Sequence, residues 1–154
     1  KGLTYGARSA FNGDKFTGDY VFSAGIKAEP TDSALTDIIR IIEEFRSEGI
    51  SNEELTFTKN SMTQSEARKY ETGFQKAAFL SNILRYGLPG DYPRMQNDIL
   101  KSMTTTDIQK LAKTKIRSTK NMTILLVGDK ARLEGKLKDR GFVIVEADAE
   151  GNLK

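Results

Sequence analysis

The spacing of apolar residues changes along this chain from a strand pattern to a helical one and then to a mixed pattern at its end. This order limits the folds that the chain can adopt. From Leu3 to Phe11 and from Phe16 to Ile26, apolar or small residues occupy every second position, which predicts two β-strands. Asn12 and Gly13 follow the first run, and both residue types tolerate a positive φ. The first part of the chain is therefore predicted to form an antiparallel hairpin with its turn at Asn12 and Gly13.

A helical spacing begins after Pro30 and continues through most of the remaining chain. The first helix is expected to end at Gly49, and a capping box from Ser51 to Glu54 predicts the start of a second. The second helical pattern runs to Leu84, with a bend or break at Thr72 and Gly73. Shorter amphipathic helices are expected at 92–103 and 105–116.

The end of the chain predicts a strand, a helix and a further strand, at 122–127, 130–140 and 142–145. The whole chain, 1–154, is predicted to be one α+β domain with an antiparallel-rich sheet packed on one face by several helices. Four strands are few for this number of amphipathic helices. We therefore expect that part of the sheet precedes Lys1.

The chain contains no histidine and no cysteine, which limits the chemistry available to it. Histidine is the usual general base near neutral pH and the commonest zinc ligand, so triads with histidine and histidine-based metal sites are excluded. Adjacent carboxylates such as Glu43 and Glu44 diverge by about 100° on a helix and cannot act together on one atom. No catalytic or metal-binding residue is predicted. No apolar run approaches the ~18 residues of a membrane span, and no membrane span is expected.

Charge is unevenly distributed along the sequence. Residues 29–54 include 8 acidic and 2 basic side chains, whereas residues 107–140 include 10 basic and 4 acidic ones. Both stretches are interpreted as solvated helix faces, with a basic docking face as the alternative. Five basic residues cluster on and after the helix at 105–116, namely Lys110, Lys113, Lys115, Arg117 and Lys120. No aromatic residues lie among them for base stacking, so nucleic acid is not an expected partner.

Tyr5 is the candidate binding residue, because it precedes Gly6 in the first predicted strand. A glycine there leaves space for close approach, and the phenol could donate a hydrogen bond to a bound peptide or transition state. The alternative is an ordinary half-buried strand aromatic. Strand alternation places Arg8 on the opposite face from Tyr5.

Several segments, in order, resemble the insulinase-type zinc metallopeptidases, the family of pitrilysin and the mitochondrial processing peptidases. The first is 1–9, which is similar to a strand near the middle of the repeated domain of that family. The similarity continues in Thr17-Gly18, Glu48-Gly49-Ile50, Ser51-Asn52-Glu53-Glu54-Leu55, Lys59-Asn60, Tyr86-Gly87-Leu88-Pro89, Thr104-Thr105-Thr106-Asp107-Ile108 and Leu126-Val127-Gly128-Asp129.

The resemblance implies a two-half peptidase in which one half carries an H-x-x-E-H zinc site and the other lacks it. Without histidine, this chain would be the later part, 1–154, of the non-catalytic half. The expected partners are the catalytic half, on the same polypeptide or on another subunit, and an extended peptide substrate. Zinc is expected only in the catalytic half, and this chain is not expected to be an enzyme or to bind a cofactor.

The family resemblance also gives Tyr5 a role, because a tyrosine on this strand reaches the substrate near zinc in active members. A partner arginine would lie before Lys1, as would about two strands and a helix of the domain. The alternative function is a structural or peptide-binding subunit without peptidase activity. The sequence does not determine the compartment.

Overall fold

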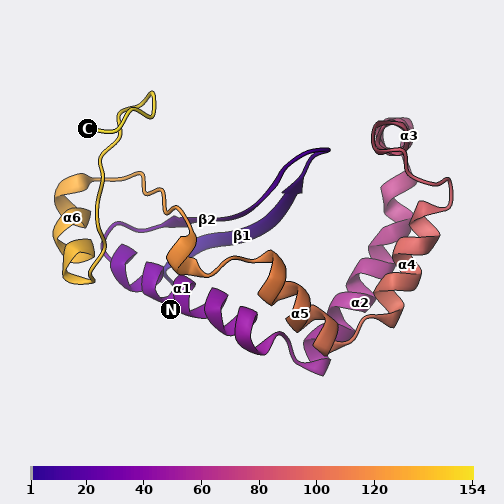
Figure 1. The fold of residues 1–154 in the computed structure, drawn as a ribbon, viewed down its shortest axis with the longest axis horizontal. Coiled ribbons are helices and arrows are strands. Elements are labelled where there is room, and N and C mark those ends of the chain that lie inside the picture. The colour runs from indigo at the N-terminus through magenta and orange to yellow at the C-terminus, as the bar shows by residue number, and fades with distance from the viewer. Residues whose placement is uncertain (1) are drawn as a thin grey trace. The chain divides into compact units, whose positions relative to one another are not determined.

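The computed structural model describes residues 2–154, with the side chain of Ala67 outside the description (Figure 1). The α+β class is confirmed: six α-helices accompany one two-stranded antiparallel sheet in the described chain. The elements are β1 (Thr4–Gly13), β2 (Gly18–Ile26), α1 (Thr31–Glu48), α2 (Asn52–Glu66), the 3-10 helix η1 (Ala67–Tyr70), α3 (Gly73–Tyr86), α4 (Tyr92–Ser102), α5 (Thr105–Lys115), the 3-10 helix η2 (Thr119–Asn121) and α6 (Lys130–Asp139).

The chain divides into two compact units. Unit 1 contains Lys1–Glu43 and Ser118–Lys154, and unit 2 contains Glu44–Arg117. The organisation of 1–154 as a single domain of a larger peptidase half stays a prediction.

The hairpin forms as predicted, but its turn lies further along the chain. Asn12 pairs with Asp19 and Gly13 with Gly18, so the loop consists of residues 14–17. Neither Asn12 nor Gly13 has a positive φ. A turn at Asn12 and Gly13 would have placed Phe11 opposite Asp14, whereas the observed register places Phe11 opposite Tyr20 with ring centroids 4.9 Å apart. Cross-strand aromatic pairing therefore accompanies a longer loop.

The helical predictions are largely confirmed, and the helices begin and end near the capping residues that the sequence predicted. Before α2, the Ser51 N–H donates to Glu54 Oε2 at 2.8 Å, and the Glu54 N–H donates to Ser51 Oγ at 3.1 Å. Thr72 and Gln75 form a second capping box, which begins α3 at the predicted break. Gly49 follows α1 with φ 79°, and Gln109 Cβ lies 3.1 Å from where a Cβ at Gly49 would be. A side chain at Gly49 would therefore be both strained and crowded.

The two strands predicted near the end of the chain are absent from the described residues. Residues 122–127 and 142–145 belong to no ladder, and no N–H from 123 to 127 donates to another backbone group within residues 2–154. Leu125 is 81% exposed and Val127 93% exposed. The β-prone composition is present, but without a partner strand the backbone groups have no ladder to join. The prediction of four strands was wrong for this chain.

The core of unit 2 lies where α5 ends. Ile116 is 2% exposed and Ala112 is 3% exposed. Arg46, near the end of α1, donates from Nε to the Ile116 carbonyl oxygen at 2.8 Å. Lys59 of α2 donates from Nζ to the carbonyl oxygens of Lys101 and Met103, and these hydrogen bonds cap the C-terminal end of α4. These long-range contacts hold helices that propensity alone does not position.

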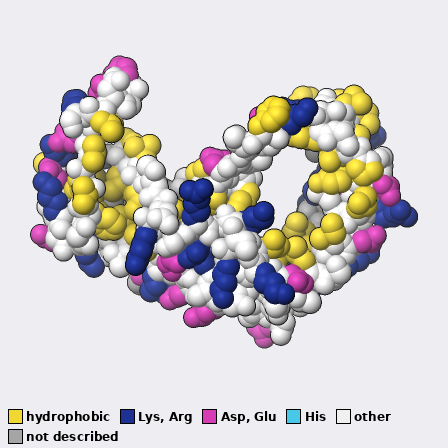
Figure 2. Space-filling view, viewed as in Figure 1, with side chains coloured by type: hydrophobic (Ala, Val, Ile, Leu, Met, Phe, Trp, Pro, Cys, Tyr) yellow, Lys and Arg dark blue, Asp and Glu magenta, His cyan; other side chains and the backbone are white. Residues whose placement is uncertain are grey.

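Other apolar side chains of unit 2 remain at the surface. Figure 2 shows hydrophobic side chains gathered over the region of α2, α3 and α4. The exposed ones include Phe57, Met62, Phe74, Leu80, Leu84, Met95 and Ile99.

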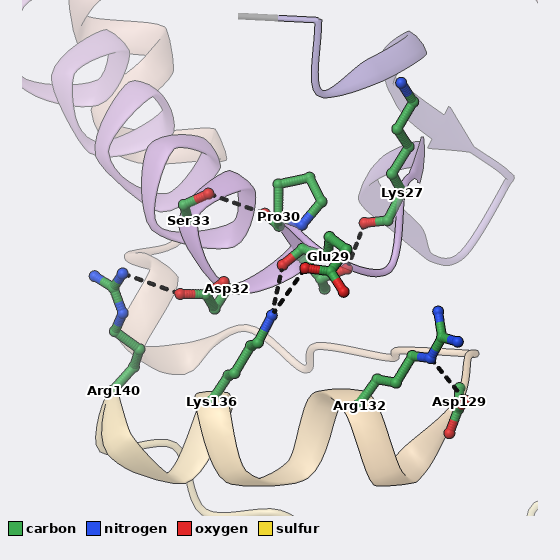
Figure 3. A network of polar contacts seen from close by, with 10 residues as sticks. Lys27, Glu29, Pro30, Asp32, Ser33, Asp129, Arg132, Lys136 and Arg140 are labelled. Carbon is green, nitrogen blue, oxygen red and sulfur yellow. Dashed lines mark hydrogen bonds and ion pairs between the residues drawn. The ribbon is translucent and has the colours of Figure 1, made fainter.

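In unit 1, α6 is tied by charged side chains to the connection between β2 and α1 (Figure 3). Lys136 Nζ donates to the Glu29 carbonyl oxygen at 2.9 Å and lies 3.8 Å from Glu29 Oε2. Arg140 donates a hydrogen bond from Nη2 to Asp32 Oδ2 at 3.0 Å. Part of the opposite charge of 29–54 and 107–140 therefore pairs within unit 1, in addition to forming solvated faces.

Asp32 also carries a shifted pKa. Removal from water acts to raise the pKa of this carboxyl. Hydrogen bonds from Arg140 and from the Ser33 N–H, together with the Arg140 charge, outweigh that effect and lower the pKa below its ordinary value. The ionised form of Asp32 is therefore the one that the fold stabilises.

Candidate functional site

The candidate site is an open depression of about 620 Å³ on the hairpin of unit 1. Both strands and the residue after β2 supply its lining, which consists of Tyr5, Gly6, Arg8, Ser23, Ala24, Gly25, Ile26 and Lys27. We call these eight residues the Tyr5 groove. The predicted binding residue therefore lies in a depression.

A β-bulge shapes the groove. Thr4 pairs with Ile26, and Ala7 pairs with Ala24, so three steps along β1 match two steps along β2. Tyr5 and Gly6 together lie opposite Gly25. A bulge changes which face the following side chains occupy and is frequent beside functional sites.

The Thr4 side chain stabilises the bulged backbone. Its Oγ1 accepts a hydrogen bond from the Gly6 N–H at 3.0 Å and lies 2.7 Å from the Gly25 carbonyl oxygen and 2.8 Å from the Gly6 carbonyl oxygen. The hydroxyl has one proton and donates to one of these oxygens at a time. Thr4 thus satisfies backbone groups that the irregular pairing would otherwise leave without partners.

Tyr5 is 93% exposed, so the alternative of a half-buried strand aromatic is wrong. Lys27 Nζ lies 5.9 Å from the centroid of its ring, within the range of a cation–π contact. This contact engages the ring, and the phenol remains available to a ligand. The role of Tyr5 in substrate binding stays a prediction.

Arg8 shares the groove with Tyr5, which corrects the expectation that strand alternation separates them. Without a bulge, residues three positions apart face opposite sides of a strand. The extra residue between Thr4 and Ala7 reverses that alternation, so Tyr5 and Arg8 line one depression.

The groove is positively charged. Among residues 2–154, Arg8 and Lys27 are the only charged residues that line it, and no aspartate or glutamate does. Glu29 follows Lys27 closely in sequence, but its contacts are to Lys136 of α6. Figure 3 shows the Lys27 ammonium directed away from that network, while the Lys27 carbonyl oxygen accepts from Thr31 Oγ1 at 2.9 Å.

The backbone beside the groove can also take part in binding. The sheet has only β1 and β2 in the part of the chain that the structure describes, so each strand has an outer edge without a ladder partner there. An extended peptide can add to such an edge through main-chain hydrogen bonds, with alternate side chains entering neighbouring depressions.

The carboxylates of Glu43 and Asp129 make structural contacts. Glu43 Oε1 accepts from Ser118 Oγ, the Thr119 N–H and Thr119 Oγ1 at 2.6–3.0 Å. Asp129 caps α6 by accepting from the Ala131 N–H at 3.0 Å. Within residues 2–154, no group of three or more aspartate or glutamate side chains is arranged to hold a metal ion. The same part of the chain contains no helix that is long and apolar enough to cross a membrane.

Sequence reasoning missed Lys27 and the bulge. The available signal was a pair of glycines, Gly6 and Gly25, inside the two predicted strands. An isolated glycine in a strand indicates a bulge or a close backbone approach.

Comparison with known proteins adds no assignment: no protein-family model matches the chain, and no curated protein matches it.

Proposed function

We propose that this chain captures extended peptides on its hairpin and does so as the non-catalytic, substrate-binding and scaffolding half of a zinc-dependent peptidase. The observation that carries the proposal is the Tyr5 groove, a depression with an almost fully exposed tyrosine on a hairpin whose outer strand edges have no ladder partner within residues 2–154. The order of segments resembling the insulinase-type peptidases supports the peptidase part. Zinc would belong to the catalytic half.

The chemistry of the groove supports peptide capture. Strand addition supplies main-chain hydrogen bonds that do not depend on peptide sequence. Gly6 has no atom within 4 Å of where a Cβ would be, so a bound backbone meets little obstruction there. The Tyr5 phenol can donate to a peptide carbonyl or, when the catalytic half is present, to the oxygen that gains charge during hydrolysis.

The test measures hydrolysis of a quenched, unstructured peptide by the natural polypeptide that carries this chain, with and without a zinc chelator. Tyr5→Phe removes only the hydroxyl, and Tyr86→Phe is its matched control, since Arg85 lies 5.5 Å from the Tyr86 ring and Gly87 follows it. We expect chelator-sensitive cleavage that falls about tenfold or more in Tyr5→Phe, because one transition-state donor contributes a few kcal/mol. Tyr86→Phe should cleave at the rate of the unmodified protein.

Binding separates the two parts of the proposal. The same peptide, fluorescently labelled, should bind the chain in an anisotropy titration. If a folded, zinc-loaded sample binds the peptide but does not cleave it, the chain is a peptide-binding subunit and not half of a peptidase. Neither binding nor cleavage would overturn the proposed function as a whole.

A further inference from the structure

We propose that the Tyr5 groove selects peptides with acidic side chains, in particular two acidic residues four positions apart. This inference rests on the proposed peptide capture and specifies the substrate class. It follows from the charge and spacing of Arg8 and Lys27 and from the N–H donors that these side chains can offer to a ligand. The resemblance to a peptidase family does not address these features.

The first observation is the local charge. The groove end of the hairpin carries Arg8 and Lys27 and no acidic residue. Asp19 is the only acidic residue of β1 and β2, and it pairs with Asn12 at the turn end. The distance from Asp19 to Ser23 along β2 is about 13 Å at the rise of a strand, beyond the Debye length at physiological salt.

The second observation is that both cations are available to a ligand. Among residues 2–154, no hydrogen bond or ion pair engages the Arg8 guanidinium, and the Lys27 ammonium contacts only the Tyr5 ring. The Lys27 ammonium is directed away from Glu29, the nearest acidic residue in the sequence, whose carboxylate lies 3.8 Å from Lys136 Nζ (Figure 3).

The third observation is spacing. Arg8 pairs with Ser23, and Lys27 lies four residues further along the neighbouring strand. Four residues of a strand span about 13 Å, and an added strand has the same repeat, with residues i and i+4 on one face. A peptide whose residues i and i+4 match the spacing of Arg8 and Lys27 brings one carboxylate to each of them. Arg8 can bind its carboxylate with two parallel hydrogen bonds.

The test compares three labelled peptides that share one extended sequence and differ at positions i and i+4, which are both Glu, both Gln or both Lys. Anisotropy titrations use the complete chain at low salt. Exposed ion pairs contribute modestly to affinity, so we expect each to strengthen binding roughly threefold and the Glu peptide to bind roughly tenfold more tightly than the Gln peptide. The Lys peptide should bind most weakly.

Three variants locate the effect. Lys27→Gln and Arg8→Gln should each reduce the preference for Glu over Gln about threefold. Lys15→Gln is the matched control, because Lys15 lies at the turn of the same hairpin with Nζ 5.9 Å from the Phe16 ring centroid. It removes the same charge and should leave the preference unchanged. Circular dichroism verifies that all three variants fold.

The outcomes are distinguishable. Equal affinity for the Glu and Gln peptides overturns the acidic preference and leaves peptide capture standing. A preference that Lys15→Gln reduces as much as Lys27→Gln assigns the effect to net charge and also overturns the groove as its source. Binding of none of the three peptides overturns both this inference and the proposed function.

Discussion

Two regions of unit 1 have strand-like sequences and reach different structures. The β1–β2 hairpin forms a ladder from Thr4 to Ile26, whereas residues 122–127 remain extended, with no ladder partner in the described chain. The second region is the more uniformly apolar of the two. Apolar, β-prone composition is therefore insufficient for a strand, and a nearby partner decides the outcome.

Sequence separation explains the difference. A loop of residues 14–17 connects β1 to β2, so their pairing requires little loop-closure entropy. Residues 122–127 have the whole of α6 before the next β-prone segment at 142–145. An antiparallel partner reached by a short turn forms readily, whereas a distant one requires further structure to hold it in place.

The most direct test of this comparison is amide hydrogen exchange. Amides within residues 19–24 that donate across the ladder, which are every second one in a two-stranded sheet, should exchange about tenfold or more slowly than their intrinsic rates, because the strands must open first. Amides of residues 123–127 should exchange near their intrinsic rates, since they donate to no backbone group within residues 2–154. Exchange followed by mass spectrometry or NMR measures both. Comparable protection in the two regions would mean that 122–127 is a paired strand.

A pair of leucine substitutions gives the next effect. Leu137 of α6 is 4% exposed, and Leu125 is 81% exposed. Leu137→Ala should lower the free energy of unfolding by about 2–5 kcal/mol through lost burial and a cavity. Leu125→Ala should change it by less than about 0.5 kcal/mol. Denaturant titration measures both values. A large loss for Leu125→Ala would show that 122–127 is buried in a sheet.

The hairpin register can be tested at Gly18. A Cβ there would lie 2.8 Å from the Asn12 carbonyl oxygen, so Gly18→Ala must displace backbone in the strand pair. We expect a destabilisation of about 1–3 kcal/mol, as for other overpacked sites. Gly25→Ala is the control, because nothing lies within 4 Å of its Cβ position. Equal thermal stability of the two variants would contradict the observed register.

The smallest expected effect concerns acid and the link between α6 and α1. The folded-state pKa of Asp32 is lower than its unfolded value, so its contribution to stability is present above about pH 4 and is lost as the pH falls through the lowered pKa. The melting temperature should therefore fall as the pH is lowered below about 4, and less steeply in Asp32→Asn. Arg140→Gln should flatten the same slope. An unchanged slope in both variants would remove this ion pair from the acid response.

The sequence was most informative where the deciding interactions are local. The capping box at Ser51 and Glu54, the break at Thr72 and the hairpin itself depend on residues a few positions apart. The exact position of the turn was harder to predict from the sequence. A favourable turn pair at Asn12 and Gly13 competed with the cross-strand contact of Phe11 and Tyr20.

For the candidate site, the sequence predicted Tyr5 as a binding residue, which stays a prediction, but it assigned Arg8 to the wrong face. Strict alternation was a sound local rule, and it failed because a bulge inserts one residue into β1. The exposure of Tyr5 and its contact with Lys27 depend on a partner strand whose register no local pattern encodes.

The amino-acid sequence by itself thus determined the absence of histidine and cysteine chemistry, the helices with their caps and the existence of the hairpin. The tertiary structure alone decided that 122–127 and 142–145 stay outside a ladder in the described chain, and that Tyr5, Arg8 and Lys27 share one groove. The physical reason is the range of the interactions: caps and periodicities act within a few residues, whereas ladders and grooves require groups from separate segments to meet in one register.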